Sequence, residues 1–177
     1  MNNQTYLQNE YLRLRNMEPE DLDVIFRIEN DSRLWEVSGT SVPFSRFVLK
    51  QYLETTQCDL FTDKQLRLMV ERLDSGAIAG IADLADFDPL HNRAAVGITI
   101  KDEYKNQGIG TQVLNLLCEY CSGYLHLNQL YAYIAYDNIF SLKLFNTCGF
   151  TESGRLKEWI HSENGYKDTL IVQKLFH

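Results

Sequence analysis

The segment 98–111 constrains the fold more than any other part of the chain. An apolar stretch ends at Ile100, a short polar loop follows, and Gly108 and Gly110 then open a run with the apolar spacing of a helix. The first turn of a helix leaves backbone N–H groups without partners, and these donors and the helix dipole favour a phosphate. Glycine lets the backbone approach the anion closely. We therefore predict a strand–loop–helix unit that binds phosphate, with Lys105 adding positive charge.

Two familiar phosphate loops do not fit this segment. A dinucleotide-binding loop needs a third glycine three residues after Gly110, where this chain has Val113. A P-loop needs Gly-Lys-Ser/Thr, whereas Gly110 is followed by Thr111 and Gln112. The two glycines alone would also fit a plain helix start. The surrounding elements must therefore decide the class of ligand.

The rest of the pattern predicts one α/β domain over residues 1–177. Apolar alternation and turn residues predict strands at 11–15, 66–73, 77–87, 94–101, 130–135, 150–160 and 166–176. Asn164-Gly165 predicts a tight hairpin between the last two strands. Helices are expected from residue 18, over 45–55, from 108 and over 138–148. Residues 31–43 contain glycine, proline and scattered serines and are expected to form a loop.

In this context the chain resembles the GNAT superfamily of acetyl-CoA-dependent N-acetyltransferases. The family's phosphate loop reads Gln/Arg-x-x-Gly-x-Gly/Ala, and 105–110 reads Lys-Asn-Gln-Gly-Ile-Gly; lysine at the first position departs from the pattern but keeps a donor. Residues 138–150 match the family's Asn-x-x-(Ser/Ala)…Gly-Phe segment. The resemblance covers essentially the whole chain. It implies a mixed, mostly antiparallel sheet of about seven strands with flanking helices, splayed between the fourth and fifth strands.

The resemblance also implies a site for acetyl-CoA as co-substrate, with no metal. The pantetheine arm would lie between the strands around 98–100 and 131–135, pairing with backbone groups of Ile98 and Ile100. Asn138 would touch the arm or the phosphates, although asparagine is also a good helix N-cap. The implied binding residues are Ile98, Thr99, Ile100, Lys105, Asn106, Gln107, Gly108, Ile109, Gly110, Thr111, Asn138, Ser141 and Phe145.

The catalytic groups are less clear from the sequence. Attack of a neutral amine on a thioester needs a route for the amine proton and donors for the oxyanion. The subgroup most similar to this chain, the spermidine N-acetyltransferases, carries a tyrosine acid where this chain has Phe145. A glutamate common on the fourth strand is replaced here by Ala95 or Val96.

Three interpretations of these departures stay open. Another group acts, with Asp83 and Glu36 the preferred candidates and Asp86, Tyr104 and Tyr136 as further ones. Alternatively, the thiolate leaves without an acid and the enzyme works by orienting its substrates. Finally, the domain binds acyl-CoA without catalysis. Asp83 and Asp86 lie three apart on a predicted strand, so we expect them on opposite faces.

The net charge of the chain limits the classes of partner that it can bind. The formal net charge of −7 argues against nucleic acid and is compatible with a cationic substrate. With no secretory signal and no long apolar run, we expect a cytoplasmic protein that does not bind membranes. The family suggests a homodimer. The predicted function is transfer of acetyl from acetyl-CoA to a polyamine or other small amine; the alternatives are a protein N-terminal acetyltransferase and a non-catalytic acyl-CoA-binding module.

Overall fold

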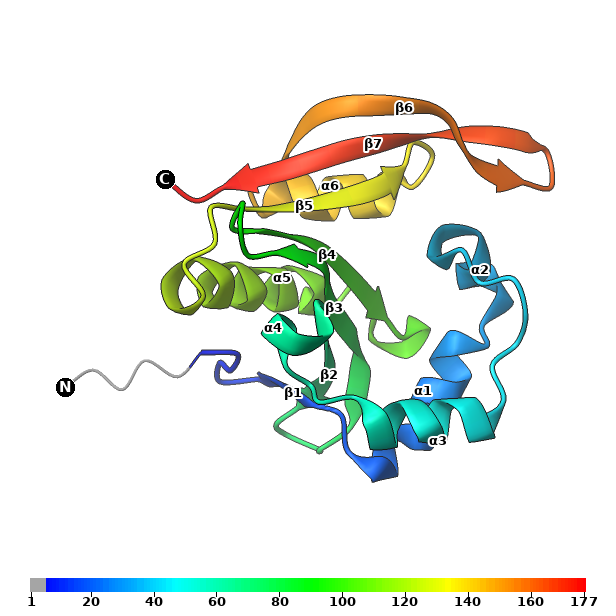
Figure 1. The fold of residues 1–177 in the computed structure, drawn as a ribbon, viewed down its shortest axis with the longest axis vertical. Coiled ribbons are helices and arrows are strands. Elements are labelled where there is room, and N and C mark those ends of the chain that lie inside the picture. The colour runs from blue at the N-terminus through cyan, green and yellow to red at the C-terminus, as the bar shows by residue number, and fades with distance from the viewer. Residues whose placement is uncertain (1–5) are drawn as a thin grey trace.

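The computed structural model describes residues 6–177, which form a seven-stranded sheet in the order β1-β2-β3-β4-β5-β7-β6 (Figure 1). All neighbouring strands are antiparallel except the β4–β5 pair. The predicted mixed, mostly antiparallel sheet is therefore confirmed. The strands are β1 (Leu12–Asn16), β2 (Leu66–Arg72), β3 (Ile78–Asp88), β4 (Arg93–Ile100), β5 (Gln129–Ala135), β6 (Thr151–Ser162) and β7 (Gly165–Leu175).

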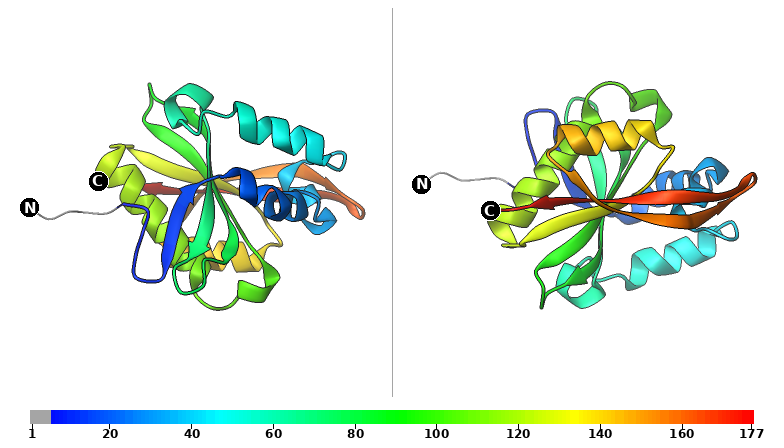
Figure 2. Two further views of the ribbon diagram at one scale, coloured as in Figure 1. Left: turned by 90° about the horizontal axis from the view of Figure 1, so that it is seen from below. Right: turned by 90° about the horizontal axis from the view of Figure 1, so that it is seen from above.

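Helices cover both faces of this sheet. The helices are α1 (Leu22–Glu29), α2 (Ser32–Ser38), α3 (Arg46–Thr55), α4 (Leu60–Asp63), α5 (Ile109–Glu119) and α6 (Ile139–Thr147). Figure 2 shows α6 on the opposite side of the strands from α3. The larger core lies under α5 and α6, and a smaller one, with Ile25, Leu49, Met69 and Ile81 at its centre, lies under α1 and α3. No helix of residues 6–177 is long and apolar enough to span a membrane.

The two central strands part soon after they meet. The parallel pairing of β4 and β5 comprises only Arg93 with Gln129, Ala94 with Leu130 and Ala95 with Tyr131. Beyond these residues each strand stays paired on its other edge, β4 with β3 as far as Ile100 and β5 with β7 as far as Ala135. The predicted splay between the fourth and fifth strands is therefore present.

One predicted loop is wrong. The helix α2 lies inside the segment 31–43, which was expected to be irregular. The Asp31 side chain accepts a hydrogen bond from the Arg33 N–H and caps the helix, and Gly39 ends it in a left-handed conformation (φ 70°). The segment is too short to show helical periodicity, so only the capping residues could have indicated it. The short helix α4 was also not predicted, whereas the other predicted strands and helices are present with small shifts at their ends.

The register of β3 against β4 requires glycine at position 80. A Cβ on Gly80 would lie 2.1 Å from the Thr99 carbonyl oxygen of β4, a clash that only a shift of the backbone can relieve. We predict that Gly80→Ala lowers the free energy of unfolding by about 1–3 kcal/mol, as overpacking does elsewhere. The measurement is denaturant unfolding, with Gly154→Ala as control, because a Cβ there meets nothing within 4 Å. Equal stability of the two variants would contradict the register.

Candidate active site

The edge of β4 that faces the gap carries free backbone groups. The Lys101 N–H donates to the Ala79 carbonyl at 2.9 Å, and the Thr99 carbonyl faces Gly80, so these alternate residues turn their polar groups toward β3. Successive residues of a strand direct their backbone groups to opposite edges. Ile98 and Ile100 therefore direct theirs into the space between β4 and β5. An extended ligand with amide groups can pair there like an added strand.

The loop after β4 leads into α5, whose N-terminus has no side-chain cap in the described part of the chain. Gly108 is the N-cap of α5 and adopts a left-handed backbone (φ 74°) with open space around it. No side chain among residues 6–177 caps this helix. Its first-turn N–H groups and the positive end of its dipole are thus available to an anion.

The remaining loop residues hold the turn in shape. The Gln107 side chain donates to the Glu103 carbonyl at 2.9 Å, and Asn106 adopts a left-handed backbone (φ 59°). The Lys105 ammonium lies 2.6 Å from an Asp102 oxygen, and both side chains are about half exposed. Lys105 is therefore free to turn toward a phosphate at the cost of one exposed ion pair, which is worth little.

The second glycine of the loop has a packing role. A Cβ on Gly110 would lie 3.1 Å from a methyl group of Leu144, so glycine here lets α6 approach α5 closely. The neighbouring Ile109 is buried in the larger core, and the Thr111 carbonyl faces the Cys148 thiol at 3.9 Å. These residues fix the angle between the two helices that flank the gap.

The predicted binding residues on α6 have structural partners of their own. The Asn138 side chain accepts from the Ser141 N–H at 3.1 Å, so Asn138 caps α6. Phe145 is 5% exposed and packs edge-to-face on Phe150, with 5.0 Å between ring centroids. The ring of Phe145 is therefore part of the core and offers no proton.

The sheet face opposite α5 and α6 carries polar and aromatic groups beside the gap. Asp83 pairs with Gly97, two residues beyond the last β4–β5 pair. By register, Tyr131 and Tyr133 of β5 lie on the same face, with their rings in a T-shaped contact at 5.7 Å. Tyr133 is 48% exposed. We call this surface, defined by Asp83, Gly97, Tyr131 and Tyr133, the acceptor face.

Asp83 is held by an arginine. The Arg67 guanidinium donates to both Asp83 oxygens, at 2.8 and 3.0 Å, and also to Glu29 at the end of α1. Burial disfavours the charge of Arg67, but the hydrogen bonds and charge of Asp83 outweigh it and raise the pKa of the guanidinium. Both carboxylate oxygens are thus engaged, although each keeps a lone pair for another donor. Asp83 presents a fixed negative charge near the point where the strands part.

The backbone at Asp86 departs from the regular strand on which its expected face was based. A β-bulge between Ala85 and Asp88 inserts an extra residue, and Asp86 takes a left-handed backbone (φ 48°). Strand alternation does not extend across a bulge. Burial and, next, the charge of Asp86 raise the pKa of Tyr131.

The other proposed catalytic residues have separate partners. The Glu36 carboxylate is 2.5 Å from the Lys167 ammonium. Tyr104 lies under the cations of Arg72 and Lys101, and Tyr136 stacks on Arg155 at 4.1 Å. Sequence reasoning missed Arg67, Tyr131 and Tyr133 as site residues. The alternation of tyrosines with apolar residues in β5 was the available signal, but it does not say which face is open.

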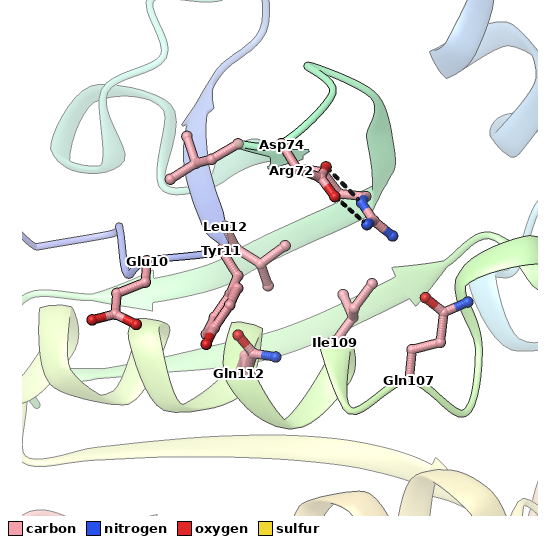
Figure 3. Close-up of a pocket in the computed structure, with 9 residues that line it drawn as sticks. Glu10, Tyr11, Leu12, Arg72, Asp74, Gln107, Ile109 and Gln112 are labelled. Carbon is pink, nitrogen blue, oxygen red and sulfur yellow. Dashed lines mark hydrogen bonds and ion pairs between the residues drawn. The ribbon is translucent and has the colours of Figure 1, made fainter.

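A pocket of about 350 Å³ borders the start of α5 but not the gap between β4 and β5. It is formed by β1, the β2–β3 turn and the start of α5, and Figure 3 shows α5 between this pocket and β5. Arg72 and Asp74 pair with each other on its wall. The lining includes Gln107 and Gln112 but no residue of β5, so this pocket is separate from the gap.

Comparison with known families agrees with this geometry. A sequence model of the family described as Acetyltransferase (GNAT) domain matches residues 11–151. The chain belongs to the GNAT acetyltransferase family. It is therefore an acetyl-CoA-dependent N-acetyltransferase, as the resemblance implied.

Several relatives share most of their length with this chain. Spermidine N(1)-acetyltransferase of Vibrio cholerae is 26% identical over 160 residues, covering 90% of each chain. The enzyme of the same name from Escherichia coli K12 is 25% identical over 162 residues, covering 90% of this chain and 83% of that one. A solved Vibrio cholerae spermidine N-acetyltransferase in complex with CoA and spermine superposes with a TM-score of 0.84 at 24% identity, covering 94% and 96% of the two chains.

The uncapped start of α5 yields a test. We predict that Gly108→Glu abolishes coenzyme A binding, because it adds bulk and negative charge at the anion site and strains a left-handed position. Isothermal titration with coenzyme A measures the affinity. Gly165→Glu is the matched control, since Gly165 also has a positive φ (112°) and open surroundings but lies in the β6–β7 turn. Unchanged affinity in the Gly108 variant would rule out this loop as the phosphate site.

Proposed function

We propose that this protein transfers the acetyl group of acetyl-CoA to a primary amine of a polyamine or another small cationic amine. The acceptor face supports the proposal, because the Asp83 carboxylate and two tyrosines lie on it beside the gap that would receive the thioester. Carboxylates attract ammonium groups, and tyrosine rings bind alkylammonium groups through cation–π contacts. The spermidine N(1)-acetyltransferase relatives support the same substrate class.

The donor and the acceptor would reach the gap from opposite sides. The α5 end would hold the pyrophosphate, while the free edge of β4 at Ile98 and Ile100 would pair with the pantetheine arm. The thioester would then lie near Gly97, within reach of groups on the acceptor face. Holding both substrates in line contributes several kcal/mol to the rate without covalent catalysis.

Proton transfer in this proposal does not use Phe145. Asp83, already paired with Arg67, would hold the incoming ammonium and draw its proton toward the carboxylate or a water. The departing thiolate is only moderately basic, and the half-exposed Tyr133 of β5 could donate a proton to it. Glu36 stays a candidate through its charge, at the outer end of the acceptor face.

Assembly and location remain predictions. The homodimer is predicted because related enzymes commonly form dimers. The cytoplasmic location is predicted from the sequence. A Vibrio cholerae relative, 25% identical and with a TM-score of 0.79, is described as dodecameric. Sedimentation velocity would measure the assembly state of this chain.

The substrate class can be tested by turnover. We expect thiol release from acetyl-CoA with spermidine or a diamine to exceed that with a short peptide by at least about tenfold in kcat/KM, a difference of one charged contact. A thiol-reactive dye reports the rate, and mass spectrometry identifies the acetylated amine. Turnover with peptides alone would favour the N-terminal acetyltransferase alternative. Binding of acetyl-CoA with no turnover would favour the acyl-CoA-binding module.

The role of Asp83 gives a second test. We predict that Asp83→Asn lowers kcat for amine acetylation about 10²-fold or more, as loss of acid–base groups does, while coenzyme A affinity stays unchanged. The control is Asp23→Asn, because Asp23 forms an exposed ion pair on α1, away from the acceptor face. An unchanged kcat would return Asp83 to a purely structural pairing with Arg67.

A further inference from the structure

The first turn of α6 presents a large apolar side chain to solvent. Phe140 is 85% exposed, more than any other large hydrophobic residue of the described chain, and its neighbour Ile139 is 64% exposed. In the same helix, Phe145 is 5% exposed. A single exposed apolar residue is ordinary on a protein surface. The significance of Phe140 therefore depends on what lies beside it.

The contacts between α5 and α6 place this ring beside the start of α5. Just after α6, the Cys148 thiol lies 3.9 Å from the Thr111 carbonyl. One turn earlier, a methyl group of Leu144 lies 3.1 Å from the position that a Cβ on Gly110 would take. The contacts thus move toward the start of α5 as α6 is followed back to its own start. Phe140 is one further turn back and on the same helix face as Leu144, so its ring lies at the uncapped end of α5.

A lysine without a carboxylate partner lies next to this ring. Lys143 is exposed and is three residues from Phe140, so the two side chains are neighbours on the surface of α6. Lys143 forms no ion pair with any residue of 6–177, whereas Lys101 and Lys105 near the phosphate loop each pair with a carboxylate. The Lys143 ammonium is thus available to an anion that binds beside Phe140.

Coenzyme A carries two groups that match this pair. Besides the thiol arm and the pyrophosphate, it has an adenine base and a phosphate on the 3′ oxygen of its ribose. Bases stack on aromatic rings, and phosphates bind ammonium groups. The ribose joins both groups to the pyrophosphate, so they must lie close to the place where the pyrophosphate binds. We expect that place at the start of α5.

We propose that Phe140 and Lys143 bind the adenosine 3′-phosphate end of coenzyme A, with the base stacked on the Phe140 ring and the 3′-phosphate on the Lys143 ammonium. The proposal concerns the coenzyme and does not depend on which amine accepts the acetyl group. Neither side chain touches the reacting atoms in this arrangement. Both therefore act on coenzyme affinity and not on the chemical step.

The pocket beside β1 is another surface that reaches the start of α5. Its lining includes the exposed ring of Tyr11, but also the carboxylates of Glu10 and Asp74. The Arg72 guanidinium of the lining is paired with Asp74. Two carboxylates against one guanidinium repel a nucleotide phosphate. We therefore assign the adenosine to α6 and use Tyr11 to test the choice.

Shortened coenzymes separate the two contacts. Calorimetry with the full protein measures the affinity for coenzyme A and for 3′-dephospho-coenzyme A, and NMR titration measures that for 4′-phosphopantetheine, which lacks the nucleotide. We expect Phe140→Ala to weaken binding of the first two about tenfold and to leave phosphopantetheine binding unchanged, because only the stacked base is affected. We expect Lys143→Met to weaken binding of coenzyme A about threefold or more and to leave the dephospho form unchanged.

Matched variants control for unspecific effects. Phe47→Ala and Lys50→Met make the same changes at exposed positions of α3, and both should leave all three affinities unchanged. Phe140→Trp keeps an aromatic ring, so it should bind coenzyme A within about twofold of the wild type. Because the ring of Phe140 is exposed, Phe140→Ala should keep the melting temperature of the wild type.

The outcomes divide clearly. The inference is overturned if Phe140→Ala binds coenzyme A as tightly as Phe47→Ala does, or if it loses affinity for phosphopantetheine to the same extent. A loss in Tyr11→Ala in place of Phe140→Ala would put the adenine in the pocket beside β1. An equal loss for both coenzymes in Lys143→Met would reject the 3′-phosphate contact. These results need no turnover, so a failure of the proposed acceptor class would be seen separately.

Discussion

The separation of β4 from β5 is the constraint on which the rest of the structure depends. Only three residue pairs join the two strands, after which each relies on one neighbour. The pairs with β3 and β7 keep both strands ordered, so the free edges stay in place instead of collapsing together. Unpaired backbone groups need partners, and water or an extended ligand must supply them. An extended ligand could therefore pair with these edges as an additional strand between β4 and β5.

Charge on the acceptor face is more balanced than the net charge of −7 suggests. Arg67 pairs with Asp83 and Glu29, and Lys167 pairs with Glu36 and Asp137, so each cation offsets one of its two carboxylate charges. The two cations differ in kind. Arginine binds bidentately and stays charged, so its pair is a fixed part of the site, while the flexible lysine forms a pair that can exchange.

The glycines of the central region serve three distinct purposes. Gly80 allows β3 to lie against the Thr99 carbonyl, Gly108 adopts the left-handed turn that begins α5, and Gly110 admits Leu144 of α6. Of the three, only Gly108 lies at the helix start where we expect a phosphate to bind. The other two fix the strand register and helix packing that put the gap and the loop in one place.

The sequence by itself determined the strands of the first half, the helix start at Gly108 and the Asn138 cap. These depend on local signals: alternation, glycines at a helix start, and capping chemistry. It failed at α2, which is too short for periodicity, and it could not foresee the bulge that breaks the alternation at Asp86. The parting of β4 and β5 could be expected only through the family resemblance.

Only the tertiary structure decided which charges meet. Arg67 lies 16 residues from Asp83 and 38 from Glu29, and Lys167 lies 131 residues from Glu36. No local pattern encodes such pairs, since they arise when β2, β3 and β7 align in register and α1 and α2 pack across the sheet. The exposure of the β5 tyrosines likewise depends on packing, because α5 and α6 cover only the opposite face of the sheet. Short-range backbone chemistry thus fixed the elements, and long-range packing fixed the site.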